Sequence, residues 1–262
     1  MSGLICRFRL LPAFACVLAL AALHAETPQA MPLLRAPQPG FVFPQKQTLN
    51  YAVDWRVFPA GVATFHVEAA GDVQHVSVEA DTVGAVNLLF RVTDRFQSSF
   101  NRVTGCSEGF SKQIVEGRRQ VNSTLQFDYA NKKAIFTERN LVSGINKHVG
   151  TPIPPCVTDS LSAIFYAASQ PMVVGQDFAF PLADSTRTVK VTMRVEGHEQ
   201  VTTPAGTFQT LRVEPTAEAG VVKNRGNIWI WYTDDSRHIP VQMRARLFWG
   251  TITFRLTSME PK

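Results

Sequence analysis

Apolar residues that recur at every second position are the feature that most constrains the fold of this chain. The first such run begins near Leu49, and its apolar members are Tyr51, Val53, Trp55 and Val57. Successive side chains of a β-strand point to opposite faces, so this spacing predicts strands with one buried face. Because the same period recurs through most of the sequence, we predict an all-β, mostly antiparallel protein.

About a dozen strands follow from this period and from the turn residues between them. They cover residues 51–57, 63–67, 73–80, 95–103, 110–116, 119–129, 133–138, 189–195, 208–213, 227–233, 241–247 and 252–256. Proline, glycine and asparagine predict turns at Pro59-Ala60-Gly61, Gly71-Asp72, Asn131-Lys132 and residues 203–206. Residues 83–90 fit either a short helix or a loop, and the polar, proline-rich residues 140–155 predict a long loop.

One helix is predicted over residues 159–169. Its apolar face consists of Leu161, Ile164, Phe165 and Ala168. This i, i+3, i+4, i+7 spacing is that of an amphipathic helix. Thr158 is the expected N-cap, Asp159 suits the first turn, and Pro171 ends the helix.

So many strands need a closed or strongly curved sheet, or two packed sheets, to protect their edges from pairing with other chains. We therefore predict a single β-rich domain over residues 48–258. Its sheet is a half-barrel or barrel, and helix 159–169 packs against the concave face. Residues 26–47 hold five prolines and little periodicity, which predicts an extended tether.

Residues 1–25 have the layout of a secretory signal peptide. Arg7 and Arg9 precede an apolar run at residues 10–23, and Ala25 supplies a small residue for cleavage. The run is too short to span a bilayer as a helix. We expect a periplasmic or secreted protein with no transmembrane segment after cleavage, and a peripheral association with the membrane is the open alternative. Lipidation at Cys16 is less favoured, because the preceding residues make a poor lipobox.

Cys106 and Cys156 are the cysteines that remain after the leader. An even pair in an oxidising compartment predicts one disulfide, and two free buried thiols are the alternative. A disulfide here would close a loop of about 50 residues and contribute roughly 4 kcal/mol by chain-entropy reasoning.

The charge balance is mild. Loss of Arg7 and Arg9 lowers the formal net charge from +5 to about +3, which is too little for a nucleic-acid footprint. Arg244, Arg246 and Arg255 could form a basic strip for anionic phospholipid or an acidic partner. A charged sheet face that discourages edge pairing is the favoured interpretation of these arginines.

Catalytic motifs are lacking from the sequence. Asp234, Asp235 and His238 are the best enzyme-like or metal-like group, but Asp-Asp-Ser-Arg is ordinary turn material. We predict no catalytic residues, no cofactor and no metal site.

Aromatic side chains are the best candidates for a ligand cavity, and a filled core is the alternative use for them. The candidate lining residues are Trp55, Phe65, Phe90, Phe165, Trp229, Trp231 and Phe254.

Four short motifs resemble the bacterial family known as domain of unknown function 3108. They are Tyr51-Ala-Val-Asp-Trp with Pro59-Ala-Gly, Asp159-Ser-Leu-Ser-Ala, Thr203-Pro-Ala-Gly-Thr-Phe, and Ile230-Trp-Tyr-Thr-Asp with Ile239-Pro-Val. The resemblance implies an exported, all-β protein without an assigned activity. At the level of fold, this family is similar to the curved half-barrels of envelope lipoprotein carriers.

The leading functional hypothesis is a non-enzymatic periplasmic carrier or binding protein for an apolar ligand, such as a lipid or an acylated protein. The second is a structural or interaction module of cell-envelope assembly, with other envelope proteins as partners. A hydrolase centred on Asp234, Asp235 and His238 is the least favoured reading.

Overall fold

The computed structural model describes residues 30–224, 226–248 and 250–261. The predicted signal peptide and Cys16 lie outside the described residues. The strands are β1 Lys46–Trp55, β2 Phe58–Ala70, β3 Val73–Thr82, β4 Thr93–Asn101, β5 Ser107–Glu116, β6 Arg119–Asp128, β7 Lys133–Asn140, β8 Asn146–Pro152, β9 Asp177–Asp184, β10 Arg187–Thr203, β11 Gly206–Ala217, β12 Asn227–Thr233, β13 Pro240–Leu247 and β14 Gly250–Glu260. The helices of the described part are α1 Gly84–Leu89, α2 Ser162–Ala168 and α3 Gly220–Asn224.

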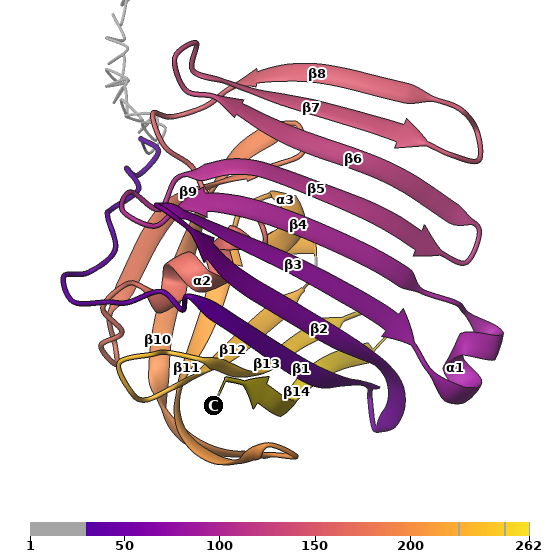
Figure 1. Cartoon of the computed structure of the whole chain (residues 1–262), viewed down its shortest axis with the longest axis vertical. Helices are drawn as coiled ribbons and strands as arrows, with labels where there is room; N and C mark the ends of the chain where they lie inside the picture. The colour runs from indigo at the N-terminus through magenta and orange to yellow at the C-terminus, as the bar shows by residue number, and fades with distance from the viewer. Residues whose placement is uncertain (1–29, 225, 249, 262) are drawn as a thin grey trace, which may run out of the picture. The chain divides into compact units, whose positions relative to one another are not determined.

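All fourteen strands belong to one antiparallel sheet, which curves around α2 (Figure 1). Its order is β8-β7-β6-β5-β4-β3-β2-β1-β14-β13-β12-β11-β10-β9. Strands that are neighbours in sequence pair with each other, with one exception: β8 and β9 do not pair and form the two edges of the sheet. In addition, the first strand, β1, pairs with the last strand, β14. The prediction of a curved, mostly antiparallel sheet with a helix against its concave face is confirmed.

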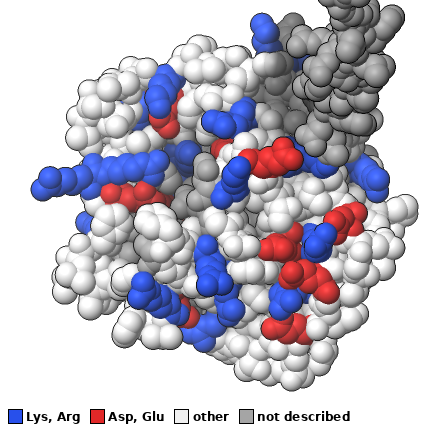
Figure 2. Space-filling model, turned by 180° about the vertical axis from the view of Figure 1, so that it is seen from behind, with Lys and Arg blue, Asp and Glu red and all other residues white. Residues whose placement is uncertain are grey.

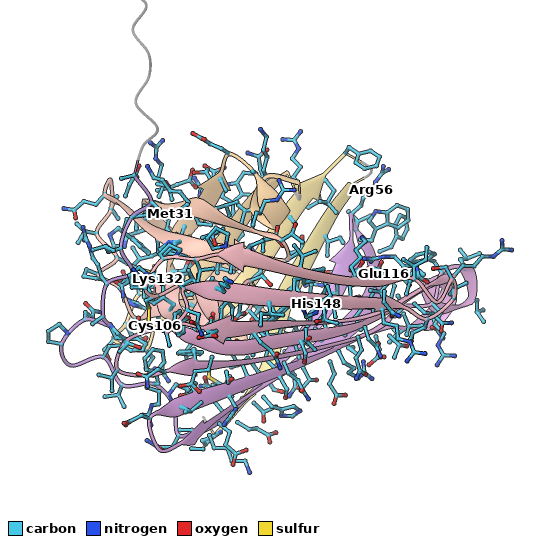
Figure 3. The ribbon with its side chains drawn as sticks, turned by 90° about the horizontal axis from the view of Figure 1, so that it is seen from above. Met31, Arg56, Cys106, Glu116, Lys132 and His148 are labelled. Carbon is cyan, nitrogen blue, oxygen red and sulfur yellow. A yellow bond between two sulfur atoms is a disulfide. The ribbon has the colours of Figure 1, made fainter. Side chains whose placement is uncertain are left out.

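Alternating strand directions place the connections at two ends of the sheet. The connections β1–β2, β3–β4, β5–β6, β7–β8, β9–β10, β11–β12 and β13–β14 lie at one end, which we call the α1 end. The other connections lie at the opposite end, which holds Cys106 and which we call the disulfide end. In Figure 3, Arg56 and Glu116 mark the α1 end, and Met31, Lys132 and Cys106 mark the disulfide end.

The core fills the space between the concave face and α2. The alternation predicted for β2 is present, because Ala63, Phe65 and Val67 are buried between more exposed residues. Phe165 and Tyr166 of α2 belong to the same core cluster. The predicted strand at 227–233 is β12, which lies in the interior of the sheet between β11 and β13.

The first hairpin turns earlier than predicted. Arg56 and Val57 form the turn, with Arg56 at φ 57°, and Pro59 lies inside β2. Asp54 pairs with Pro59 while Val53 pairs with Gly61, so the register shifts at this point. A proline has no N–H to donate to a ladder, and a bulge is one of the places where a strand tolerates it.

Two strands were not predicted. Residues 146–152 form edge strand β8 where a long loop was expected, and residues 177–184 form edge strand β9. β8 has no buried residue and so carries no apolar alternation. β9 contains Pro181, and edge strands are where proline is tolerated.

The predicted helix 159–169 is present as α2, but it spans only Ser162–Ala168, and the hydrogen bonds at its start differ from the prediction. Thr158 donates its backbone N–H and its hydroxyl to the Pro181 carbonyl in β9 and so does not cap α2. Instead, Asp159 Oδ1 accepts the backbone N–H groups of Leu161 and Ser162 at 2.8 and 2.9 Å. The carboxylate thus takes the role that we assigned to the threonine hydroxyl.

The described part of the proline-rich segment is extended but packs on the domain. Tyr166 of α2 donates its hydroxyl to the Arg35 carbonyl at 3.0 Å and accepts the Arg35 N–H at 3.2 Å. Gln38 donates its N–H to Ser169, and Phe43 is buried in the core. We call residues 31–45 the strap.

Candidate functional site

The seven candidate aromatic residues do not line one cavity. Phe65, Phe165 and Trp231 are buried in the main core, and Trp229 and Phe254 pack half-buried against it. Trp55 and Phe90 lie at the α1 end and are 38% and 53% exposed. Five of the seven therefore gather in or beside one filled core, because α2 occupies the concave face, and two lie away from it.

A buried carboxylate joins α2 to the sheet. Asp159 Oδ2 accepts hydroxyl hydrogen bonds from Ser98 of β4 and Ser107 of β5, each at 2.7 Å. The Asp159 N–H donates to the hydroxyls of Ser107 and Ser162 at 2.8 and 2.9 Å. Burial raises the pKa of this carboxyl above its ordinary value, although the hydrogen bonds it accepts oppose that shift.

This cluster accounts for the Asp159-Ser-Leu-Ser-Ala motif in structural terms. Its aspartate and second serine start the helix and hold it against β4 and β5. Because every polar atom in the cluster has a partner inside the protein, the geometry supports anchoring rather than chemistry on a substrate. Ser98 and Ser107 were not predicted as partners of Asp159, because nothing in the local sequence distinguishes them from other serines in strands.

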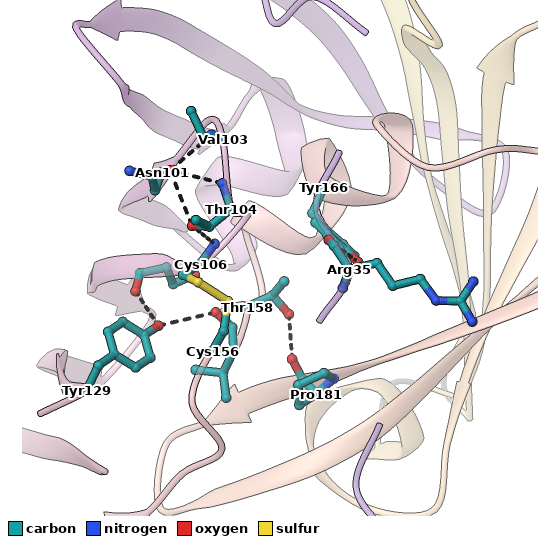
Figure 4. The surroundings of a disulfide bond; sticks show 12 residues. Arg35, Asn101, Val103, Thr104, Cys106, Tyr129, Cys156, Thr158, Tyr166 and Pro181 are labelled. Carbon is teal, nitrogen blue, oxygen red and sulfur yellow. Dashed lines mark hydrogen bonds between the residues drawn. A yellow bond between two sulfur atoms is a disulfide. The ribbon is translucent and has the colours of Figure 1, made fainter. Parts of the chain in front are cut away.

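The predicted disulfide between Cys106 and Cys156 is confirmed, and it joins the β4–β5 connection to the segment that follows β8 (Figure 4). Tyr129 donates its hydroxyl to the Ser107 carbonyl at 2.6 Å. On the other side, Thr158 forms an isolated parallel bridge with Leu182 of β9. Residues 153–159, which we call the seam segment, thus connect β5 to β9.

A cavity of about 110 Å³ lies beside the seam segment, between the inner faces of β4–β6 and the β9–β10 turn. Part of its wall is apolar, with Phe96, Phe110, Ile114, Leu125 and Phe136. The rest is polar and includes Asp94, Lys112, Ser160 and Asp184. We call this space the seam cavity. Apolar walls with a few polar groups are the usual lining of a small-molecule site, but the volume is well below the usual range of about 300–1,000 Å³.

The outer face of the sheet carries a second, more open hollow of about 490 Å³ across β2–β6. One cross-strand row passes through it and consists of Thr48, His66, Ser77, Gln97, Ser111, Thr124, Thr137 and His148. Hydroxyl, amide and imidazole groups of this kind keep a solvent-facing sheet surface hydrated and can form hydrogen bonds with a polar ligand.

The structure does not bring Asp234, Asp235 and His238 together. Asp234 Oδ2 lies 2.9 Å from His198 Nδ1, and the Asp235 carboxylate pairs with Arg237 at 2.7 Å. His238 Nδ1 lies 2.7 Å from the Ala168 carbonyl oxygen. Within residues 30–261 as described, no group of three His, Cys, Asp or Glu side chains is placed to hold a metal ion.

The three arginines of the predicted basic strip share the outer face of β13 and β14, since Gln242 pairs with Arg255 in the ladder. Arg255 forms an ion pair with Asp54 at 2.7 Å, and Arg244 lies 5.3 Å from the centre of the Trp231 ring. On the face shown in Figure 2, basic and acidic side chains lie interleaved rather than in one basic field.

Comparisons with known proteins agree with this architecture. The fold defines a class of β-barrel-like proteins: a protein of domain of unknown function DUF1849 from Brucella abortus, described as β-barrel-like, superposes with a TM-score of 0.56 at 8% identity, over 82% of this chain and 97% of that one. Residues 50–257 match the family model "Protein of unknown function (DUF3108)", and the chain belongs to that family.

Two further solved structures were found at lower similarity. One is described as an exported protein with a YmcC-like fold from Bacteroides fragilis, with a TM-score of 0.38, 8% identity and coverage of 84% of this chain and 98% of that one. The other is described as a lipoprotein from Parabacteroides distasonis, with a TM-score of 0.37, 11% identity and coverage of 84% and 98%. A search of curated proteins found no match. No helix in the described residues is long and apolar enough to span a membrane.

Proposed function

We propose that this is an exported, non-enzymatic binding protein that holds the apolar part of an amphiphilic ligand, a lipid or an acylated protein, in the seam cavity. The observation that carries the proposal is the mixed lining of that cavity. Phe96, Phe110 and Leu125 suit a hydrocarbon group, while Lys112 and Asp184 suit a polar group attached to it. The leader in the sequence and the Cys106–Cys156 disulfide support export.

The size of the seam cavity limits what it can hold. A cavity of about 150 Å³ is known to admit benzene, so about 110 Å³ suits a short branch or the end of an acyl chain. The remainder of a larger ligand would lie along the inner faces of β6–β8. β8 is an edge strand without a buried residue, so this side offers access.

The test is binding of N-phenyl-1-naphthylamine, an apolar fluorophore, and its displacement by palmitate. Ala183 is buried and lines the cavity, so Ala183→Phe fills the space that the probe needs. We expect at least a tenfold weaker binding of the probe. The matched control is Ala205→Phe, which adds the same ring at the half-buried β10–β11 turn at the disulfide end and should bind normally. Equal binding by both variants would contradict the proposal.

The second candidate, an interaction module of envelope assembly, is favoured by the filled core. Since α2 occupies the concave face, most of the aromatic residues are already used in packing. Native mass spectrometry of the protein purified from its own envelope separates the two functions. A binding protein should retain a small amphiphile, whereas an assembly module should retain another protein.

A further inference from the structure

Exposed apolar side chains gather at the α1 end of the sheet. Leu88 and Leu89 are 88% and 87% exposed, Val57 is 83% exposed and Phe248 is fully exposed. Others at the same end are Trp55, Phe58, Val83, Phe90, Leu141, Val142 and Ile145. They lie on four separate connections, β1–β2, β3–β4, β7–β8 and β13–β14, or, for Trp55 and Phe58, on the strand residues that flank the first of these. Because all four connections are at one end of the sheet, these exposed apolar tips face the same side of the molecule.

Helix α1 is the clearest case. Its sequence, Gly-Ala-Val-Asn-Leu-Leu, contains one polar side chain, yet it has no buried residue. An apolar helix normally buries its surface against the domain, and a monomer rarely leaves such surface in water. Packing therefore does not explain why leucines occupy positions 88 and 89.

Basic residues accompany these apolar tips. Counted with the strand residues that flank them, the seven connections at the α1 end hold six basic and three acidic residues in the described part of the chain: Arg56, Arg91, Arg118, Arg119, Arg187 and Lys223 against Glu116, Asp184 and Glu218. Arg56 lies 5.5 Å from the centre of the Trp55 ring, which places a cation beside an aromatic residue at the tip of the first hairpin.

We infer that the α1 end docks on the surface of a bilayer that contains anionic phospholipid. Leucine and phenylalanine at loop tips enter the boundary between headgroups and acyl chains, and tryptophan prefers the same depth. Arginine side chains at the rim reach the phosphates while their stems stay in apolar surroundings. Several tips on separate loops suit a flat, deformable lipid surface. This inference does not depend on ligand binding in the seam cavity.

The test is flotation of the purified protein with vesicles of phosphatidylglycerol and phosphatidylcholine in equal parts, compared with phosphatidylcholine alone. We expect binding to the anionic vesicles that weakens with added salt. The variant with both Leu88→Ser and Leu89→Ser should partition at least about tenfold less. Both residues are exposed, so this change leaves the core intact.

The electrostatic contribution is tested with Arg91→Gln and Arg118→Gln together. Each basic residue near an anionic leaflet contributes about 1 kcal/mol, so partitioning should fall about thirtyfold. The matched controls are at the disulfide end: Val173→Ser with Val174→Ser, which are 49% and 41% exposed, and Lys132→Gln with Lys133→Gln, which removes two positive charges from exposed positions. The N-terminal leader is the same in every variant, so differences between variants report on the α1 end.

Three outcomes would overturn the inference. The first is no binding of the unaltered protein to anionic vesicles. The second is equal loss of binding by the variants at both ends of the sheet. The third is self-association in sedimentation experiments without lipid that Leu88→Ser with Leu89→Ser abolishes, because the surface would then be an interface between copies of this chain.

Discussion

Individual residues decide where the strands can approach one another, and Gly61 is the clearest example. It follows the bulge in β2, and a Cβ atom at this position would lie 2.5 Å from the Asp81 carbonyl oxygen in β3. That oxygen belongs to the backbone, so relief of the clash requires the ladder to move. We predicted this glycine in a turn. In the structure it instead allows β2 and β3 to pack closely.

Gly61→Ala should therefore destabilise the protein by about 2 kcal/mol, in the range of other overpacking changes. Urea unfolding measures this as a lower midpoint. The matched control is Gly197→Ala in β10, where an added Cβ meets nothing within 4 Å and stability should change by no more than about 0.5 kcal/mol. Equal midpoints for the two variants would show that β2 and β3 have more space than described.

Asp159 gives a prediction about pH. Burial raises the pKa of its carboxyl, whereas the unfolded chain titrates near the ordinary value of about 4. Between these two pKa values the folded protein holds a proton at Asp159 that the unfolded chain has lost. The contribution of this proton to the free energy of unfolding is therefore complete below about pH 4, and it decreases as pH rises through the pKa of the folded state.

The variant Asp159→Asn lacks this titration. The free energy of unfolding of the unaltered protein minus that of Asp159→Asn should therefore decrease as pH rises from 4 to 8. Other carboxyls, including Asp235 with its lowered pKa, occur in both proteins and cancel in the difference. Denaturant titrations at a series of pH values measure it, and a difference that grows with pH would contradict the direction of the shift.

At the scale of elements, the seam segment holds together parts of the sheet that have no ladder between them. Residues 153–159 are bound to β5 through Cys106–Cys156 and through the Ser107 N–H, which donates to Val157 at 2.8 Å. They are bound to β9 through Thr158 and Ala183. The disulfide fixes this bridge at the point where the chain passes from one edge of the sheet to the other.

Cys106→Ser with Cys156→Ser should reduce stability by about 4 kcal/mol, because the bond closes a loop of 50 residues. Calorimetry should show a lower Tm for this variant, and the unaltered protein should approach the same Tm in dithiothreitol. Amide exchange should quicken first in residues 153–159. An unchanged Tm would mean that hydrogen bonds alone hold the bridge.

The strands that could be predicted from the sequence and those that could not differ in how many of their residues are buried. Strands with one buried face, such as β2 and the first half of β10, show the period of two directly. Edge strand β8 buries no residue, so its sequence is indistinguishable from that of a loop. Asp159 was recognised at the helix start, but its partners in β4 and β5 depend on pairings between distant parts of the chain.

For the whole molecule, the pairing of the first and last strands is the contact that completes the sheet. β14 is the last strand in the chain but lies in the interior of the sheet, between β1 and β13. Without it, two interior ladders are lost and Leu256, which is fully buried, no longer covers the core. The candidate cavity could not be placed from the sequence for a related reason: its walls come from β4–β7 and from the β9–β10 turn, which lie on opposite sides of the β1–β14 ladder in the strand order.

A chain that ends before Gly250 should not fold cooperatively. Its amide resonances should show poor dispersion, and limited proteolysis should degrade it throughout. Removal of Pro261 and Lys262 alone is the control, since the pairing of Thr48 with Glu260 remains. Protease resistance of the shorter chain would show that the two meanders, β1–β8 and β9–β13, are stable without their shared ladder.

The position of β8 and β9 has a consequence for how such a protein can change in length. Both are terminal members of the sheet, yet they follow one another in the chain. Hairpins added or deleted between Pro152 and Asp177 would widen or narrow the sheet without altering the register of any remaining pair. A hairpin inserted anywhere else would have to separate two bonded neighbours. Variation in strand number among relatives should therefore concentrate at this single junction, while the β1–β14 ladder stays constant.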